Sequence, residues 1–193
     1  MRIIAGQLRG RTYKAKEDDS VRPISGRIKK SLFDIVHGLV PGSKWLDLFC
    51  GTGAVGIEAL SRGAEFVFFV DQSRRVVEDL EATLKKIGLA GKARVQPGNV
   101  LADLSWVPFR GGVERFDMIF MGPPYKDLEK RPLAFTTPAL AKVAESSLLA
   151  PKGWIMCQHQ VKEDVVVPAG YARVRREKYG DTFLDFVRRA DAA

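Results

Sequence analysis

From residue 44 onward, short apolar runs alternate with segments whose apolar positions recur at the spacing of a helical turn. The apolar runs predict strands at 44–49, 65–71, 93–97, 116–121 and 153–160. The helical spacing predicts helices at 54–62, at 73–89 and within 138–149, with a further short segment around 99–104. Because the strands lack a polar face, the pattern indicates an α/β fold in which helices cover both faces of a mostly parallel sheet.

Two more strands are expected at the end of the chain, at 172–179 and 182–189, and with the five above they make seven. The turn Gly180-Asp181 between them is too short for a crossover connection, so this closing pair must be antiparallel. We therefore expect a mostly parallel sheet with an antiparallel last strand.

The first 40 residues do not show this alternation of strands and helices. Two short segments separated by glycines predict a small hairpin over 2–16. Apolar positions at helical spacing then predict an amphipathic helix over 25–40, with Ser25 as its N-cap. We expect residues 1–40 to form a basic extension that packs on a domain formed by residues 41–193.

The composition fits a single globular domain of ordinary size. The chain has 193 residues, of which 46% are hydrophobic and 28% charged, and this excludes a disordered or collagen-like protein. No apolar run approaches the roughly 18 residues of a membrane-spanning helix, and the first residues lack the charge pattern of a signal peptide. Cys50 and Cys157 form no CxxC pair, so we expect no disulfide framework and no metal site. A soluble cytoplasmic protein with no membrane partner is the expectation.

The positive charge is concentrated near the start of the chain. Residues 1–30 carry nine basic and three acidic side chains, which is +6 of the total formal charge of +8. Lys and Arg bind polyanions by neutralising phosphates, so this flank predicts a nucleic-acid partner. Charge alone fits a basic surface that maintains solubility equally well, and it does not distinguish RNA from DNA or anionic lipid. The candidate nucleic-acid contacts are Arg2, Arg9, Arg11, Arg22, Arg27, Lys29 and Lys30.

A glycine-rich turn joins the first strand of the alternating region to its helix. Gly51, Gly53 and Gly56 match the spacing GxGxxG, and Asp71 follows Gly51 by 20 residues, at the end of the second strand. An acidic residue there can bind ribose hydroxyls, so we expect a nucleotide-containing cofactor at the strand ends. The alternative is a tight strand-to-helix turn without a ligand.

Asp47 indicates which cofactor this is. A carboxylate four residues before the first glycine would repel the pyrophosphate of a dinucleotide. S-adenosyl-L-methionine has no phosphate and carries an ammonium and a sulfonium, so a carboxylate favours it over NAD. Asp47 could instead cap a helix or pair with a nearby base. After the third strand, Asn99 could hydrogen-bond the adenine edge while Val100 packs on its face.

The fourth strand ends in the turn Phe120-Met121-Gly122-Pro123-Pro124-Tyr125. Together, the sequence DLFCGTG, the acid closing the second strand and this Pro-Pro-aromatic turn resemble class I methyltransferases that act on exocyclic or amide nitrogens. RIIAGQLRGR at the start, VRPISGRIKKSLFDI before the first strand and YGDTFLDF near the end extend the resemblance over essentially the whole chain. With them, the sequence resembles the bacterial 16S ribosomal RNA guanine-N2 methyltransferases of the RsmD type.

The resemblance implies a class I methyltransferase sheet and methylation of a guanine in the 16S ribosomal RNA of the small subunit, with S-adenosyl-L-methionine as the donor. We expect a monomer, although the sequence does not fix the oligomeric state. The donor-binding residues that it implies are Asp47, Phe49, Gly51, Gly53, Asp71, Gln72, Asn99 and Val100. Those implied for presenting the base are Gly122, Pro123, Pro124 and Tyr125. A rigid Pro-Pro backbone can accept hydrogen bonds from the amine, and Tyr125 can stack on an extruded base.

Gly122 departs from the family pattern, which has Asp or Asn at this position. The missing side chain would accept a hydrogen bond from the target amine, and losing one such group typically costs about 3 kcal/mol in the transition state. We therefore expect transfer to be weakened or absent unless a water or a backbone carbonyl substitutes. The alternatives are a homologue that binds donor and RNA without turnover, a methyltransferase for DNA or protein glutamine, and an NAD-dependent oxidoreductase.

Overall fold

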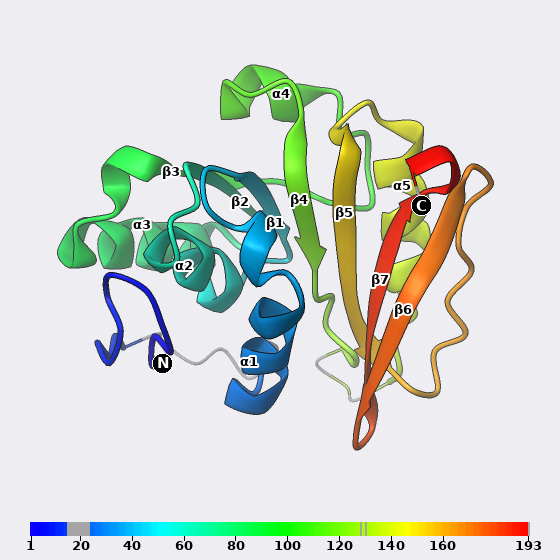
Figure 1. Cartoon of the computed structure of the whole chain (residues 1–193), viewed down its shortest axis with the longest axis horizontal. Coiled ribbons are helices and arrows are strands. Elements are labelled where there is room, and N and C mark those ends of the chain that lie inside the picture. Colours follow the sequence, from blue (N-terminus) through cyan, green and yellow to red (C-terminus); the bar gives the residue numbers. More distant parts are fainter. Residues whose placement is uncertain (15–23, 128, 130, 193) are drawn as a thin grey trace.

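The computed structural model describes residues 1–14, 24–127, 129 and 131–192. Within them, seven strands form one sheet in the order β3-β2-β1-β4-β5-β7-β6 (Figure 1). The strands are β1 (Lys44–Leu48), β2 (Phe66–Asp71), β3 (Ala93–Pro97), β4 (Phe116–Met121), β5 (Leu149–Gln160), β6 (Tyr171–Tyr179) and β7 (Thr182–Arg189). Strands β1 to β5 pair in parallel, and β7 is antiparallel to both of its neighbours. The predicted α/β sheet with an antiparallel last strand is confirmed.

Helices cover both faces of this sheet. The α-helices are α1 (Gly26–Ile35), α2 (Ala54–Ser61), α3 (Arg74–Ile87), α4 (Trp106–Gly111) and α5 (Thr136–Glu145), and short 3-10 turns lie at His37–Leu39, Ala90–Lys92 and Ala190–Ala192. Apolar side chains of α1, α2 and α3 share one buried cluster, and those of α4 and α5 share another. The predicted helix over 25–40 is confirmed, although its last turn is 3-10. The sequence did not predict α4, because six residues are too few to show a helical period.

The strands alternate between the two clusters. Trp45 and Phe69 face the cluster of α1 to α3, where Trp45 stacks on Phe33 with ring centroids 5.5 Å apart. Their neighbours Leu46 and Phe68 face the cluster of α4 and α5. All five side chains are fully buried, as expected for strands without a polar face.

The N-terminal hairpin packs against the end of α2. Arg2 and Thr12 form an antiparallel bridge, so the predicted hairpin is confirmed, although residues 15 and 16 of its range lie outside the described part. Gly6 has a φ of +81°, and a Cβ there would lie 1.8 Å from the carbonyl oxygen of Ser61. Glycine is therefore required where the hairpin meets the helix.

Glu58 of α2 joins the hairpin, α1 and α2 through one buried carboxylate. It accepts hydrogen bonds from the backbone N–H groups of Ile4 and Ala5, each 2.9 Å long. The Lys29 ammonium lies 3.0 Å from Oε2, and Arg62 Nε lies 2.9 Å from Oε1. Burial alone would raise the pKa of Glu58, but these hydrogen bonds and the Lys29 charge lower it below its usual value.

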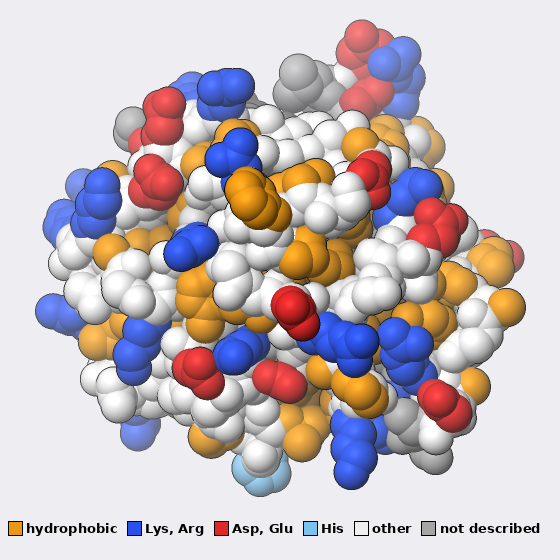
Figure 2. Space-filling model, turned by 90° about the horizontal axis from the view of Figure 1, so that it is seen from above, with side chains coloured by type: hydrophobic (Ala, Val, Ile, Leu, Met, Phe, Trp, Pro, Cys, Tyr) orange, Lys and Arg blue, Asp and Glu red, His pale blue; other side chains and the backbone are white. Residues whose placement is uncertain are grey.

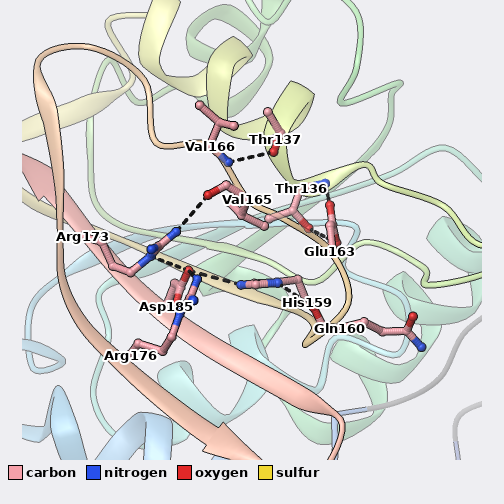
Figure 3. A network of polar contacts seen from close by, with 10 residues as sticks. All are labelled: Thr136, Thr137, His159, Gln160, Glu163, Val165, Val166, Arg173, Arg176 and Asp185. Atoms are coloured by element: carbon pink, nitrogen blue, oxygen red, sulfur yellow. Dashed lines mark hydrogen bonds and ion pairs between the residues drawn. The ribbon is translucent and has the colours of Figure 1, made fainter.

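A second buried carboxylate, Asp185, joins the last three strands (Figure 3). Arg176 of β6 donates to both of its oxygens, at 2.6 and 2.8 Å, and Arg173 Nε lies 2.7 Å away. His159 of β5 contacts the same carboxylate from the other side, at 3.2 Å. Burial would raise the pKa of Asp185, but the hydrogen bonds from Arg176 and His159 and the charge of Arg173 lower it well below its usual range. Two arginines of the basic edge strand β6 are thus paired with a buried carboxylate of the protein itself.

The lowered pKa of Asp185 makes stability depend on pH in a definite direction. A carboxyl group whose folded-state pKa is depressed stabilises the fold fully above the unfolded value of about 3.9, and this contribution is lost as pH falls through that value toward the folded one. We expect the free energy of unfolding, measured in urea, to fall more steeply between pH 5 and 3 for the parent chain than for Asp185→Asn. Equal slopes for the two proteins would contradict the assignment.

Glu58→Gln is expected to lower the free energy of unfolding by about 3–5 kcal/mol, because it leaves the buried Lys29 ammonium without its counter-charge. Urea unfolding followed by circular dichroism measures this. The matched control is Asp34→Asn, which breaks the exposed Lys30–Asp34 pair and should cost under about 1 kcal/mol. Similar losses of unfolding free energy in both variants would contradict a stabilising role for the buried Glu58–Lys29 pair.

Candidate functional site

A cavity opens where the sheet changes its direction of winding, between the carboxyl ends of β1 and β4. These strands are neighbours, but the chain leaves β1 toward β2 on one side and leaves β4 toward β5 on the other. Such a switch point is where open α/β sheets bind ligands. The cavity encloses about 380 Å³, including its open mouth, and its walls come from the turn after β1, the start of α2 and the ends of β4 and β5.

The turn after β1 has an unusual backbone. Phe49 has a φ of 56°, the left-handed region that non-glycine residues rarely adopt, and Gly51 and Gly53 are left-handed as well. A Cβ at Gly56 would lie 2.2 Å from the ring of Phe69, so α2 approaches the sheet more closely than any side chain would permit. The glycine spacing predicted from sequence therefore serves turn geometry and helix–sheet packing. Phe49 lines the cavity.

Asp47 lies at the carboxyl end of β1, is 1% exposed, and lines the cavity. Its Oδ2 accepts a hydrogen bond of 2.9 Å from the N–H of Gly56 in the first turn of α2. Burial, reinforced by the nearby charge of Asp71 and opposed by the Gly56 N–H, raises the pKa of Asp47 to about 8. One oxygen thus caps a helix, and a cation in the cavity would favour ionisation of the group.

Asp71 shapes the same turn from the end of β2. Its Oδ2 accepts from the N–H of Gly51 at 3.0 Å, and its Oδ1 accepts from the N–H of Ser73, also at 3.0 Å. The exposed Gln72 follows it. Binding of ribose by these two residues stays a prediction, because neither is among the cavity-lining residues.

The two residues expected at the adenine lie beyond the end of β3. Asn99 is exposed, and its Oδ1 accepts from the N–H of Leu101 at 2.9 Å, as in an Asx turn. Val100 is 2% exposed and belongs to the buried cluster of α4 and α5. Its side chain therefore has little surface left to pack on a base.

The turn after β4 follows Phe120, the residue of β4 that is in register with Asp47. Gly122 lines the cavity, Pro123 is buried, and Pro124 and Tyr125 are half-buried. The Tyr125 hydroxyl accepts a 2.9 Å hydrogen bond from Gln158 Nε2 and lies 3.5 Å from the hydroxyl of Thr182. The phenol is therefore anchored to β5 and β7.

Gln158 of β5 lines the cavity and was missed by the sequence analysis. The available signal was a polar residue within the apolar run GWIMCQHQ. Ile24 and Phe120 also line the cavity, and they were missed because apolar side chains at a site do not differ from core residues in sequence.

The basic residues near the start of the chain, predicted to contact nucleic acid, differ in their exposure and in their contacts. Arg2, Arg9 and Arg27 are exposed, and Arg27 lies 5.8 Å from the ring centroid of Tyr179. Arg11 and Lys30 are exposed as well, with Arg11 donating to the carbonyl of Ile87 and Lys30 paired with Asp34.

The prediction that Lys29 contacts nucleic acid was wrong. Its side chain is buried and its ammonium binds Glu58 and the carbonyl oxygen of Arg2, so no phosphate can reach it. Arg22 lies outside the described residues.

The end of the molecule that carries α4 shows no single-sign surface. There, Lys and Arg side chains are mixed with acidic and apolar ones (Figure 2). No described helix combines the length and the hydrophobicity that crossing a membrane requires.

Comparison with known proteins shows which family this chain is similar to. The family described as Conserved hypothetical protein 95 matches residues 1–188. The ribosomal RNA small subunit methyltransferase D of Escherichia coli is 31% identical, over 92% of this chain and 84% of the relative, and that of Haemophilus influenzae is 26% identical, over 93% and 89%.

A solved structure of a hypothetical protein from Thermus thermophilus superposes with a TM-score of 0.77 at 31% identity, covering 97% of this chain and 99% of the other. The class I methyltransferase fold implied by the sequence is confirmed. The chain belongs to the Conserved hypothetical protein 95 family and is a homologue of the small-subunit ribosomal RNA methyltransferases of the RsmD type.

Proposed function

We propose that this chain methylates the exocyclic N2 of a guanine in the 16S ribosomal RNA of the small subunit, with S-adenosyl-L-methionine as the donor. The observation that supports the donor most strongly is Asp47, a buried carboxyl group with a raised pKa that faces a cavity at the switch point of the sheet. A buried carboxyl group of this kind suits a ligand with a cationic tail. It does not suit a pyrophosphate.

The residues around the cavity fit the donor in chemistry as well as in position. The bound donor would supply an electrophilic methyl group on a positively charged sulfur. Asp47 would hold the ammonium of its methionine portion, and the left-handed turn at Phe49, Gly51 and Gly53 would let the backbone approach that portion closely. Asp71 and Gln72 would bind the ribose.

The turn from Gly122 to Tyr125 would hold the acceptor base. Its two prolines stiffen the backbone next to the cavity, which favours a fixed orientation of a weak nucleophile. The Tyr125 ring would stack on the base, with its hydroxyl fixed by Gln158. Orientation matters here because the lone pair of the guanine amine is delocalised into the ring.

The exposed cations of the N-terminal segment support RNA as the substrate over a protein. Phosphate binding gives these cations a purpose that a glutamine side chain would not. DNA is the second candidate substrate for the same charge.

Transfer assays with small ribosomal subunits, naked 16S rRNA, DNA and protein substrates distinguish these candidates. We expect tritium from the donor to enter the rRNA, and digestion followed by mass spectrometry to recover N2-methylguanine.

Donor binding should release close to one proton at pH 7. With a pKa of about 8, the Asp47 carboxyl is mostly protonated at that pH, and binding a cation requires its ionised form. The apparent affinity should consequently weaken by about tenfold for each pH unit below 8. Calorimetry in buffers of different ionisation enthalpy measures the number of protons released.

The matched variant for this experiment is Asp47→Asn. Its side-chain oxygen can still accept from the Gly56 N–H, so the start of α2 is kept while the titratable group is removed. We expect no proton release and weaker donor binding. Unchanged affinity and unchanged proton release would show that another group meets the cationic tail.

Arg9→Gln should weaken RNA binding at all sequences and reduce the slope of log affinity against log salt by about 0.7–0.9. Arg9 is exposed in the hairpin, so its loss leaves the core intact. The control is Lys152→Gln, an exposed cation near the start of β5, at the end of the sheet away from the cavity. Filter binding at several salt concentrations compares them, and equal slopes in the two variants would exclude Arg9 from the RNA-binding surface.

A further inference from the structure

Gln158, a residue that lines the cavity, carries a buried acceptor atom. Its side chain is 8% exposed, and its Oε1 is buried without a hydrogen bond among the described residues. Buried polar atoms are almost always paired, because they lose their hydrogen bonds to water when the protein folds. Where such an atom belongs to a residue that lines a ligand cavity, the ligand can supply the missing donor.

The orientation of the amide follows from its neighbours. The Tyr125 hydroxyl has the Thr182 hydroxyl within 3.5 Å as an acceptor, and it accepts in turn from Gln158 Nε2 at 2.9 Å. This arrangement directs the nitrogen of the amide to Tyr125 and leaves the oxygen for another donor. Gln158 and Tyr125 thus form one unit, in which the aromatic ring of the turn fixes the amide.

Gln158 also lies beside the position where the family pattern has an acidic or amide side chain. Met121 of β4 is in register with Cys157 of β5, so Gly122 and Gln158 follow as neighbours at the same end of the sheet. A Cβ at Gly122 would lie 4.0 Å from the Cβ of Gln158. A side chain from either position can therefore reach the same part of the cavity.

We propose that Gln158 Oε1 accepts the hydrogen bond from the exocyclic amine of the target base, in place of the side chain that Gly122 lacks. This assignment rests on the proposed function of the site. The carboxamide is neutral, so it orients the amine, and the proton that the nitrogen loses on methylation passes to solvent and not to Gln158. This acceptor comes from β5 and not from the turn after β4.

The test is the single-turnover rate of methyl transfer to small ribosomal subunits at saturating tritiated donor, with the donor Kd and Tm measured in parallel. Gln158→Met keeps the length of the side chain and removes the amide. We expect its rate to fall about a hundredfold, with the donor Kd changed less than about threefold. Gln160→Met, the same substitution two residues along β5 and away from the cavity lining, should leave the rate unchanged.

Rescue from the neighbouring position separates hydrogen bonding from a structural effect. Gly122→Asn in the Gln158→Met background should recover tenfold or more of the lost rate, because its amide oxygen enters the same space. The Phe120 ring, 3.2 Å from the new Cβ, must move by a few tenths of an ångström. In the parent chain, Gly122→Asn should change the rate by less than about threefold, because an acceptor is already present.

A Gln158→Met variant as fast as the parent overturns this assignment while the proposed function stands. A slow variant that Gly122→Asn does not rescue, or whose donor Kd rises in step with the loss of rate, also overturns it, because Gln158 then acts on the fold or on the donor. A large gain from Gly122→Asn in the parent chain does the same, since it would show that the acceptor is missing. A parent chain that binds donor and transfers nothing overturns the proposed function, and this assignment with it.

Discussion

The hydrogen bond between the buried Asp47 carboxyl and the N–H of Gly56 connects the sheet to its first helix, and the site is built around it. It fixes the start of α2 against the end of β1. Because Gly56 has no side chain, α2 can lie close enough to β2 for this bond to form. The turn between them then has to close in the left-handed region, including at Phe49. A single acidic residue thereby sets both the backbone shape of the cavity and its electrostatic preference for a cation.

The same helix is held near its other end by a second buried carboxylate. Glu58 gathers the hairpin, Lys29 and Arg62 around α2, so the N-terminal segment and the methyltransferase sheet share one core. Tyr13 of the hairpin lies close to both acids: burial, and then the charges of Asp47 and Glu58, raise its pKa. The basic segment is therefore structural in part. Its other described cations, Arg2 and Arg9 among them, are exposed.

The sequence predicted the fold well because the features that determine it can be read from short stretches of the chain. Strands apolar on both faces, glycines at a strand-to-helix turn and a two-residue turn before β7 each depend on a few adjacent residues. The partner of Lys29 could not be predicted this way, since Glu58 is 29 residues distant. The only local sign of burial was the helical spacing of Lys29 with the apolar Leu32 and Phe33. Val100 is buried in a cluster that includes α4, a helix that the periodicity did not predict, and this leaves little of its side chain for a base. Gln158 becomes informative only when the pairing of β4 and β5 brings it beside Gly122.

The absence of an acidic side chain at Gly122 has an electrostatic consequence for the donor side of the cavity. Asp47 already ionises with difficulty, since it is buried and since Asp71 lies close enough to raise its pKa further. A carboxylate at position 122 would add a negative charge at the cavity that Asp47 lines, and like charges oppose ionisation. A neutral amide from Gln158 offers the target amine an acceptor without that penalty. The chain can thus keep an oriented acceptor at the cavity while Asp47 is left as the acidic group for a cationic donor.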